Sequence, residues 1–82
     1  MKARIKENAG EIFLKEALKV FKVLPPTYLE YYQRLKDLAG KVFEAEEDGE
    51  DRLLLKYDKP KRIKGCLIVG ISVDKRLVEI IP

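Results

Sequence analysis

Residues 35–47 read LKDLAGKVFEAEE, and the spacing of their apolar side chains changes in the middle of the stretch. Before Gly40 the apolar positions fit the period of an amphipathic helix. From Lys41 on they alternate with charged residues, which is the period of a half-buried strand. Gly40 itself stands where a left-handed glycine would end the helix. The stretch therefore predicts a helical half followed by a sheet half, an α+β fold in a single domain over residues 1–82.

Two helices are predicted before Gly40, over residues 9–24 and 28–39. Pro25-Pro26 ends the first, because the residue before a proline is pushed out of the helical region. Thr27 followed by Glu30 fits a capping box at the start of the second. Since the link is so short, we expect a two-helix hairpin packed on one face of an antiparallel sheet of about four strands.

The sheet residues, 41–81, divide into four expected strands, at 41–46, 52–57, 65–73 and 76–81. We expect Phe43 to lie opposite Leu55 across a loop longer than two residues. A two-residue turn at Asp48-Gly49 would instead set carboxylates against one another, which is unfavourable.

The last hairpin is predicted to turn at Asp74-Lys75 and to pair Val69 with Ile80. Strand 65–73 is apolar on both faces, which is typical of a central strand. One sheet face then lacks a helix to cover it, and a second copy of the chain is one candidate cover.

Residues 1–7 alternate between charged side chains and the apolar Ala3 and Ile5. Two interpretations stay open: an extra N-terminal edge strand guarded by lysines, or a basic disordered arm.

The composition places the chain in a broad class. Charged residues make up 38% of it, there is no histidine, and the net charge is +3. Dense Lys, Arg and Glu with few thermolabile residues is a pattern of hyperthermophile proteins. A single cysteine favours a reducing cytoplasm, and no stretch resembles a membrane span or a signal peptide. We expect a cytoplasmic protein from a thermophile.

The sequence offers no catalytic residue, no metal site and no cofactor site. Without histidine, the commonest general base and metal ligand is missing. Cys66 is expected to be a buried structural thiol in a central strand. The acidic residues within 44–51 lack the order of a calcium-binding loop, so a solvated turn is favoured over a cation site.

The basic run KPKRIK, residues 59–64, is the strongest candidate for ligand contact. Clustered cations bind phosphates, and an aromatic ring can stack on a base. The residues expected to contact nucleic acid are Lys56, Tyr57, Lys59, Lys61, Arg62 and Lys64. The alternative without a ligand is a solvated loop whose cations interact with acidic residues of the same or a neighbouring chain.

The main functional hypothesis is a non-catalytic protein-interaction module that forms a homodimer or other homo-oligomer. Tyrosines suit a subunit boundary, where the ring is buried and the hydroxyl stays wet. The expected interface combines a tyrosine stripe with an uncovered sheet face: Tyr28, Tyr31, Tyr32, Ile68, Leu77 and Ile81. Nucleic-acid binding through residues 56–64 is the alternative.

The expected order of elements, a strand, two helices and then three or four antiparallel strands, resembles the layout of RelE/ParE-type toxins. That resemblance implies cleavage of ribosome-bound mRNA or action on gyrase. The RNA-cleaving members usually carry basic and aromatic residues on their last strands. Here those strands read CLIVGISVDKRLVEIIP, with only Lys75-Arg76 at the turn. Because no motif residue can be carried over, a toxin is the third hypothesis.

Overall fold

The computed structural model describes residues 1–82, apart from the side chain of Ile63. Its elements in chain order are β1 (Lys2–Ile5), α1 (Ala9–Leu18), α2 (Pro26–Asp37), β2 (Val42–Glu47), β3 (Arg52–Ile63), β4 (Cys66–Asp74), a 3₁₀ turn (Lys75–Leu77) and β5 (Val78–Ile81). None of the described helices is long and apolar enough to span a membrane.

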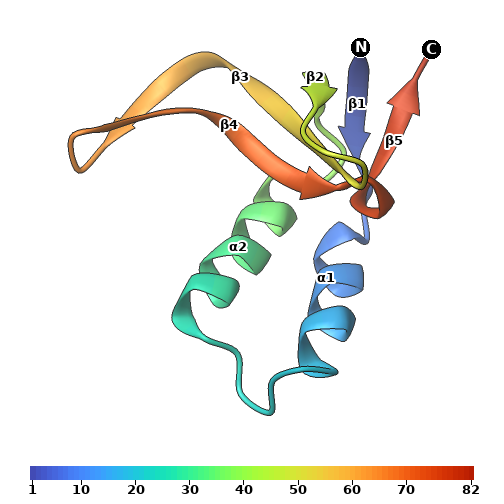
Figure 1. Ribbon diagram of the computed structural model, residues 1–82, viewed down its shortest axis with the longest axis vertical. Coiled ribbons are helices and arrows are strands. Elements are labelled where there is room, and N and C mark those ends of the chain that lie inside the picture. The colour runs from blue at the N-terminus through green and yellow to red at the C-terminus, as the bar shows by residue number, and fades with distance from the viewer.

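The fold is α+β: a five-stranded antiparallel sheet with a helical hairpin on one face (Figure 1). The strand order is β4-β3-β2-β1-β5. This confirms the predicted fold class, including the extra N-terminal strand. The core lies between the helices and the sheet, where the largest fully buried side chains are Ile5, Leu35, Leu53, Leu55 and Val73.

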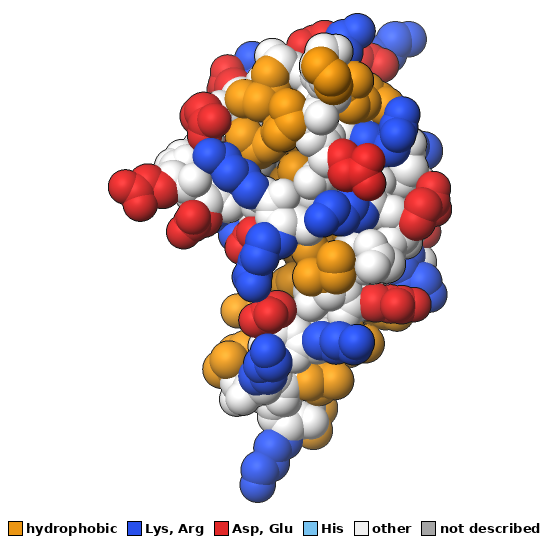
Figure 2. Space-filling view, turned by 90° about the vertical axis from the view of Figure 1, so that its right-hand side faces the viewer, with side chains coloured by type: hydrophobic (Ala, Val, Ile, Leu, Met, Phe, Trp, Pro, Cys, Tyr) orange, Lys and Arg blue, Asp and Glu red, His pale blue; other side chains and the backbone are white. Residues whose placement is uncertain are grey.

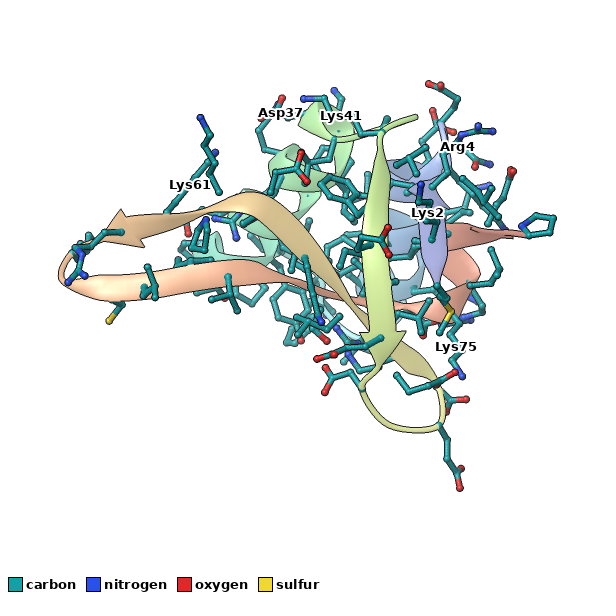
Figure 3. All side chains as sticks on the ribbon, turned by 90° about the horizontal axis from the view of Figure 1, so that it is seen from above. Lys2, Arg4, Asp37, Lys41, Lys61 and Lys75 are labelled. Carbon is teal, nitrogen blue, oxygen red and sulfur yellow. The ribbon has the colours of Figure 1, made fainter. Side chains whose placement is uncertain are left out.

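The N-terminal segment forms a strand, but β1 lies inside the sheet and not at its edge. It pairs with β2 on one side and with β5 on the other. Ala3 and Ile5 are buried against the helices, while Lys2 and Arg4 point to solvent (Figure 3). The alternation of apolar and charged residues therefore reflects a strand inside the sheet that is buried on one face only.

The predicted hairpin between residues 65–73 and 76–81 is wrong. Val69 does not face Ile80, because β5 pairs with β1 at the opposite side of the sheet. The carboxylate of Asp74 accepts a hydrogen bond from the backbone N–H of Arg76 at 2.8 Å and so caps a 3₁₀ turn. This turn leads the chain away from β4, which becomes an edge strand and not a central one.

The β2–β3 connection uses a loop longer than two residues, as expected, but the predicted register is off by two. Ala45, not Phe43, lies opposite Leu55. The loop closes where the backbone N–H of Asp48 donates to the carbonyl of Arg52 at 3.0 Å. A shift of two residues keeps every side chain on its predicted face of the sheet. The predicted faces of the β2 and β3 side chains are therefore correct, whereas the predicted residue pairs are wrong.

The first helix is shorter than the sequence pattern indicated, and the second begins and ends two residues earlier. α1 ends at Leu18, well before Pro25. The predicted capping box of Thr27 and Glu30 is wrong, because α2 begins at Pro26 and has no side-chain cap. Gly40 has a φ of 80°, the left-handed conformation expected after α2. Gly10 allows the helices to approach closely, since a Cβ there would lie 3.0 Å from Lys36 Cγ and 3.2 Å from a ring carbon of Tyr32.

Candidate nucleic-acid interface and neighbouring pocket

β3 and β4 extend beyond the other strands as a two-stranded hairpin, which projects away from the helices (Figures 1 and 3). We call its residues 58–69 the β-arm. Its turn contains Lys64 and Gly65, with φ values of 50° and 81°. Two successive positive φ angles are those of a type I′ turn, whose twist matches the twist of the flanking strands. The basic run is therefore mostly strand and turn, not a loop.

The β-arm begins at an irregularity in the pairing. Lys56 pairs with Gly70, and the next pair is Lys61 with Ile68, so β3 carries extra residues here. A Cβ at Gly70 would overlap with the carbonyl oxygen of Leu55. Glycine is thus required where the two backbones approach at the base of the β-arm.

Four cations of the β-arm stand in solvent: Lys59, Lys61, Arg62 and Lys64. Within the described part of the chain, none of them lies within ion-pair distance of a carboxylate. Asp58 is the one acidic residue of the β-arm, so its net charge is 4 − 1 = +3. On the side of the molecule that carries α1 and β5, by contrast, cations and carboxylates are interspersed (Figure 2).

The pairing distributes the cations over both faces of the β-arm. Directly opposite residues in an antiparallel pair project on the same face. Lys61 lies opposite Ile68, and Arg62 lies opposite Leu67. Each face thus combines a cation from β3 with an apolar side chain from β4. Lys61 stands out from β3 in Figure 3.

Two of the six residues predicted to contact nucleic acid interact with other residues of the same chain. Lys56 Nζ lies 2.8 Å from Glu46 Oε2. Tyr57 is half-buried, with its ring 6.3 Å from that of Phe43 and 5.7 Å from Lys61 Nζ. One side of its ring is therefore covered, and among the predicted contacts the exposed cations without an ion-pair partner are the four of the β-arm.

The predicted uncovered sheet face does not exist as one patch. Leu77 is only 4% exposed and belongs to the core of its own chain. Ile68 and Ile81 are half-buried and lie on β4 and β5, the two opposite edges of the sheet. Because β5 leaves β4 after the 3₁₀ turn, these three side chains are separated and do not form a common interface.

The tyrosine stripe is also divided. Tyr28 and Tyr31 pack on Phe13, with ring centres 5.7 and 4.8 Å apart. Tyr32 turns toward α1 and lies under Lys36 Nζ at 5.4 Å. Two tyrosines thus join a pocket and the third fills the contact between the helices.

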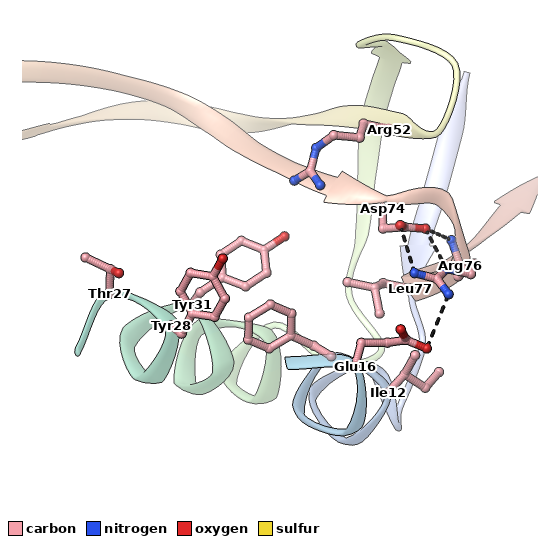
Figure 4. Close-up of a pocket in the computed structure, with 10 residues that line it drawn as sticks. Ile12, Glu16, Thr27, Tyr28, Tyr31, Arg52, Asp74, Arg76 and Leu77 are labelled. Carbon is pink, nitrogen blue, oxygen red and sulfur yellow. Dashed lines mark hydrogen bonds and ion pairs between the residues drawn. The ribbon is translucent and has the colours of Figure 1, made fainter. Parts of the chain in front are cut away.

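The pocket lies between the helical hairpin and the end of β4 (Figure 4) and encloses about 400 Å³. Its lining residues are Ile12, Phe13, Glu16, Thr27, Tyr28, Tyr31, Arg52, Asp74, Arg76 and Leu77. This volume lies in the range of small-molecule sites. A ligand site of this kind also needs polar groups free to fix the orientation of the ligand.

Three charged side chains of the pocket, Glu16, Asp74 and Arg76, are bonded to one another. Arg76 contacts Asp74 at 3.2 Å and Glu16 at 3.4 Å. The hydrogen bond from Arg76 is the main reason that the pKa of Asp74 lies below its ordinary value. Among the described residues, no buried side-chain nitrogen or oxygen lacks a partner. The three charged groups are therefore engaged with one another, and we assign the pocket no ligand.

Ser72 anchors the hairpin of helices to the sheet edge. The Tyr31 hydroxyl donates to the Ser72 carbonyl at 2.7 Å, and Arg52 Nη2 donates to the same oxygen at 3.0 Å. Ser72 Oγ in turn donates to Asp48 at 2.8 Å. Burial raises the pKa of the Tyr31 hydroxyl above its ordinary value, so this hydroxyl stays a donor over a wide pH range.

Among the remaining candidate residues, the position of Cys66 differs from the prediction. Cys66 is exposed at the end of the β-arm and not buried, because β4 is an edge strand that continues past the helices. In the described structure, no group of three or more Asp, Glu or Cys side chains is placed to hold a metal ion. Within the acidic segment, Glu46 and Glu47 instead pair with Lys56 and Lys75, each at 2.8 Å.

Comparison of the chain with protein-family models, with curated proteins and with solved structures finds no match. The arguments about function therefore rest on the chemistry of the β-arm itself.

Proposed function

We propose that this protein binds double-stranded nucleic acid through the phosphate contacts of its β-arm. The observation that carries the proposal is the group of four exposed cations without ion-pair partners on a hairpin that projects from the body. Cations held in this way release condensed counterions when they meet phosphates, which supplies sequence-independent affinity.

The absence of an aromatic platform favours a duplex over a single strand. Residues 58–69 contain no Phe, Tyr or Trp, and the ring of Tyr57 is packed against Phe43. Proteins that hold single strands rely on bases stacking on aromatic rings. Cations spaced along a ribbon instead suit the regular backbone of a duplex. The free thiol of Cys66 fits a reducing cytoplasm, where we place the protein.

The test is fluorescence anisotropy with a labelled duplex and a labelled single strand of the same sequence. If all four cations contact phosphates, log affinity falls against log salt with a slope of about −3.6 for one chain. We expect the duplex to bind more tightly than the single strand. No duplex binding at low salt would overturn the proposal.

A pair of charge-matched variants separates the β-arm from the overall charge. Lys61→Glu/Arg62→Glu should remove about half of the salt slope. Lys15→Glu/Lys22→Glu changes the net charge equally, at exposed residues outside the sheet, and should leave the slope nearly unchanged. An equal loss in both variants would mean that affinity follows overall charge and not the β-arm.

A further inference from the structure

The β-arm carries exposed cations on both of its faces. Successive residues of a strand point to opposite faces, so Lys61 and Arg62 project from opposite sides of the ribbon. Both side chains are exposed, and in the described part of the chain neither lies within ion-pair distance of a carboxylate. If the β-arm lay flat along a duplex, one of these two cations would point away from the phosphates. A position between two phosphate backbones uses both cations.

The thickness of the β-arm decides which groove of a duplex it fits. The β-arm projects beyond the helices as a single layer of two strands (Figures 1 and 3). Packed sheets lie about 10 Å apart, so one layer with its side chains is about 10 Å thick. The major groove of B-form DNA is about 12 Å wide and admits a two-stranded ribbon, whereas the minor groove is about 6 Å wide. The β-arm therefore fits the major groove and is too thick for the minor groove.

We propose that the β-arm enters the major groove of B-form DNA with its turn first, so that Lys61 and Arg62 contact the phosphates of opposite strands. This inference rests on the proposed function and names the kind of duplex that the β-arm binds. The first three strand pairs after the turn end with Lys61 opposite Ile68 and span about 7 Å along the β-arm. The groove is about 8.5 Å deep. Lys61 and Arg62 therefore lie near its rim, where the phosphates are.

The apolar side chains of the β-arm suit the same groove. Leu67 is 58% exposed and lies opposite Arg62. The methyl group of thymine is presented in the major groove, whereas the minor groove presents no such apolar group at A·T pairs. A leucine beside a cation therefore finds a partner for each side chain there: the thymine methyl group at the floor and a phosphate at the rim.

The acidic residues of the chain lie away from the turn of the β-arm. The acidic segment 47–51 borders the start of β3, so it lies at the other end of that strand. At the base of the β-arm, α2 contributes Glu30, Arg34 and Asp37 to a cleft that Lys61 also lines. The net charge of these three α2 residues is 1 − 2 = −1. Because this side of α2 is weakly repulsive to phosphates, the outer part of the β-arm meets the DNA and the cleft does not.

The first experiment is fluorescence anisotropy of the full chain with a DNA duplex and an RNA duplex of the same sequence and length. Both duplexes carry phosphates, but the major groove of A-form RNA is too narrow for side chains to read, so the β-arm cannot enter it. We expect the DNA duplex to bind roughly 10-fold more tightly at the same salt. Equal or tighter binding of RNA would overturn groove entry and leave the proposed function standing. No binding to either duplex would overturn both.

The second experiment separates entry between two backbones from contact along one face. Lys61→Ala and Arg62→Ala should each reduce the salt slope for the DNA duplex by about 0.9, because each removes one phosphate contact. Lys15→Ala is the matched control, since Lys15 is exposed on α1, and it should leave the slope unchanged. A reduction in only one of the two β-arm variants, or in neither, would overturn the proposal.

The third experiment identifies the groove by chemical protection of the DNA duplex at saturating protein. Dimethyl sulfate methylates guanine N7, which lies in the major groove, and adenine N3, which lies in the minor groove. We expect the bound protein to protect guanine N7 and to leave adenine N3 reactive. Protection of adenine N3 alone, or of neither atom, would overturn the assignment to the major groove.

Discussion

The inner and outer halves of β3 and β4 have similar apolar residues in opposite environments. In the inner half, Leu55 and Ile71 are buried under the helices, whereas in the β-arm Leu67 is 58% exposed. Both halves belong to the same two antiparallel strands. The difference lies in the helical layer, which covers one half and not the other (Figure 1). The apolar side chains of β4 therefore stabilise the single chain only where helices cover them.

The largest expected effect contrasts two leucines on these strands. Leu55→Ala should lower the free energy of unfolding by about 2–5 kcal/mol, because it leaves a cavity in the core. Leu67→Ala should cost less than about 0.5 kcal/mol, because its side chain is exposed in the monomer. Denaturant unfolding at low protein concentration measures both. Equal losses of unfolding free energy would show that Leu67 is packed as tightly as Leu55, which would contradict the difference between the two halves.

The junction between the two halves gives the next effect. Gly70→Ala should destabilise the protein by about 1–3 kcal/mol, because the added methyl group overlaps with the Leu55 carbonyl and forces the strands apart. Cys66→Ala, at the exposed end of the same strand, is the control and should unfold like the wild type. An unchanged unfolding midpoint for Gly70→Ala would mean that the two strands separate there at little cost.

Tyr31 connects the helices to the inner half of β4, and its loss should have a smaller effect. Tyr31→Phe removes the hydrogen bond to Ser72 and should cost about 1 kcal/mol. Tyr32→Phe is the control, since the Tyr32 hydroxyl makes no hydrogen bond in the described part of the chain.

The same residue predicts a pH dependence. Burial raises the pKa of Tyr31 above its ordinary value of 10.0, so the unfolded chain loses this proton first. The contribution of Tyr31 is therefore complete below about pH 10 and is lost as pH rises toward the pKa of the folded state. The difference in unfolding free energy between wild type and Tyr31→Phe should shrink over that range. A difference that is constant with pH would contradict the assignment.

The smallest effect on stability is expected for two cations of the β-arm, Lys61 and Arg62. Their substitution is expected to have the largest effect on nucleic-acid binding. Lys61→Glu/Arg62→Glu should change the free energy of unfolding by less than about 0.5 kcal/mol, because both side chains are exposed and without ion-pair partners. Thermal unfolding measures this with the protein used for anisotropy. A large loss of stability would mean that these residues support the fold, and reduced nucleic-acid binding could then not be attributed to phosphate contacts.

Part of the candidate site could be predicted from the sequence. The basic run at 59–64 was recognisable because cations cluster there, and five of the six predicted contacts are exposed, all but Tyr57. The intramolecular partners of Lys56 and Tyr57 could not be predicted, because Glu46 and Phe43 lie on another strand. The predicted interface failed at Leu77 for a similar reason: the path of the chain after Asp74 decides which face that residue joins.

By itself, the sequence determined the element types, since the periods of helix and strand follow from backbone geometry. It determined the left-handed glycine at residue 40, because few other residues tolerate that conformation. Only the tertiary structure decided the order of the strands. β1 offered two open edges, one to β2 and one to β5, and the Asp74 cap turned the chain away from β4. As a result, β4 has a neighbour on one side only. This strand order depends on pairing between residues far apart in the sequence, which no local pattern encodes.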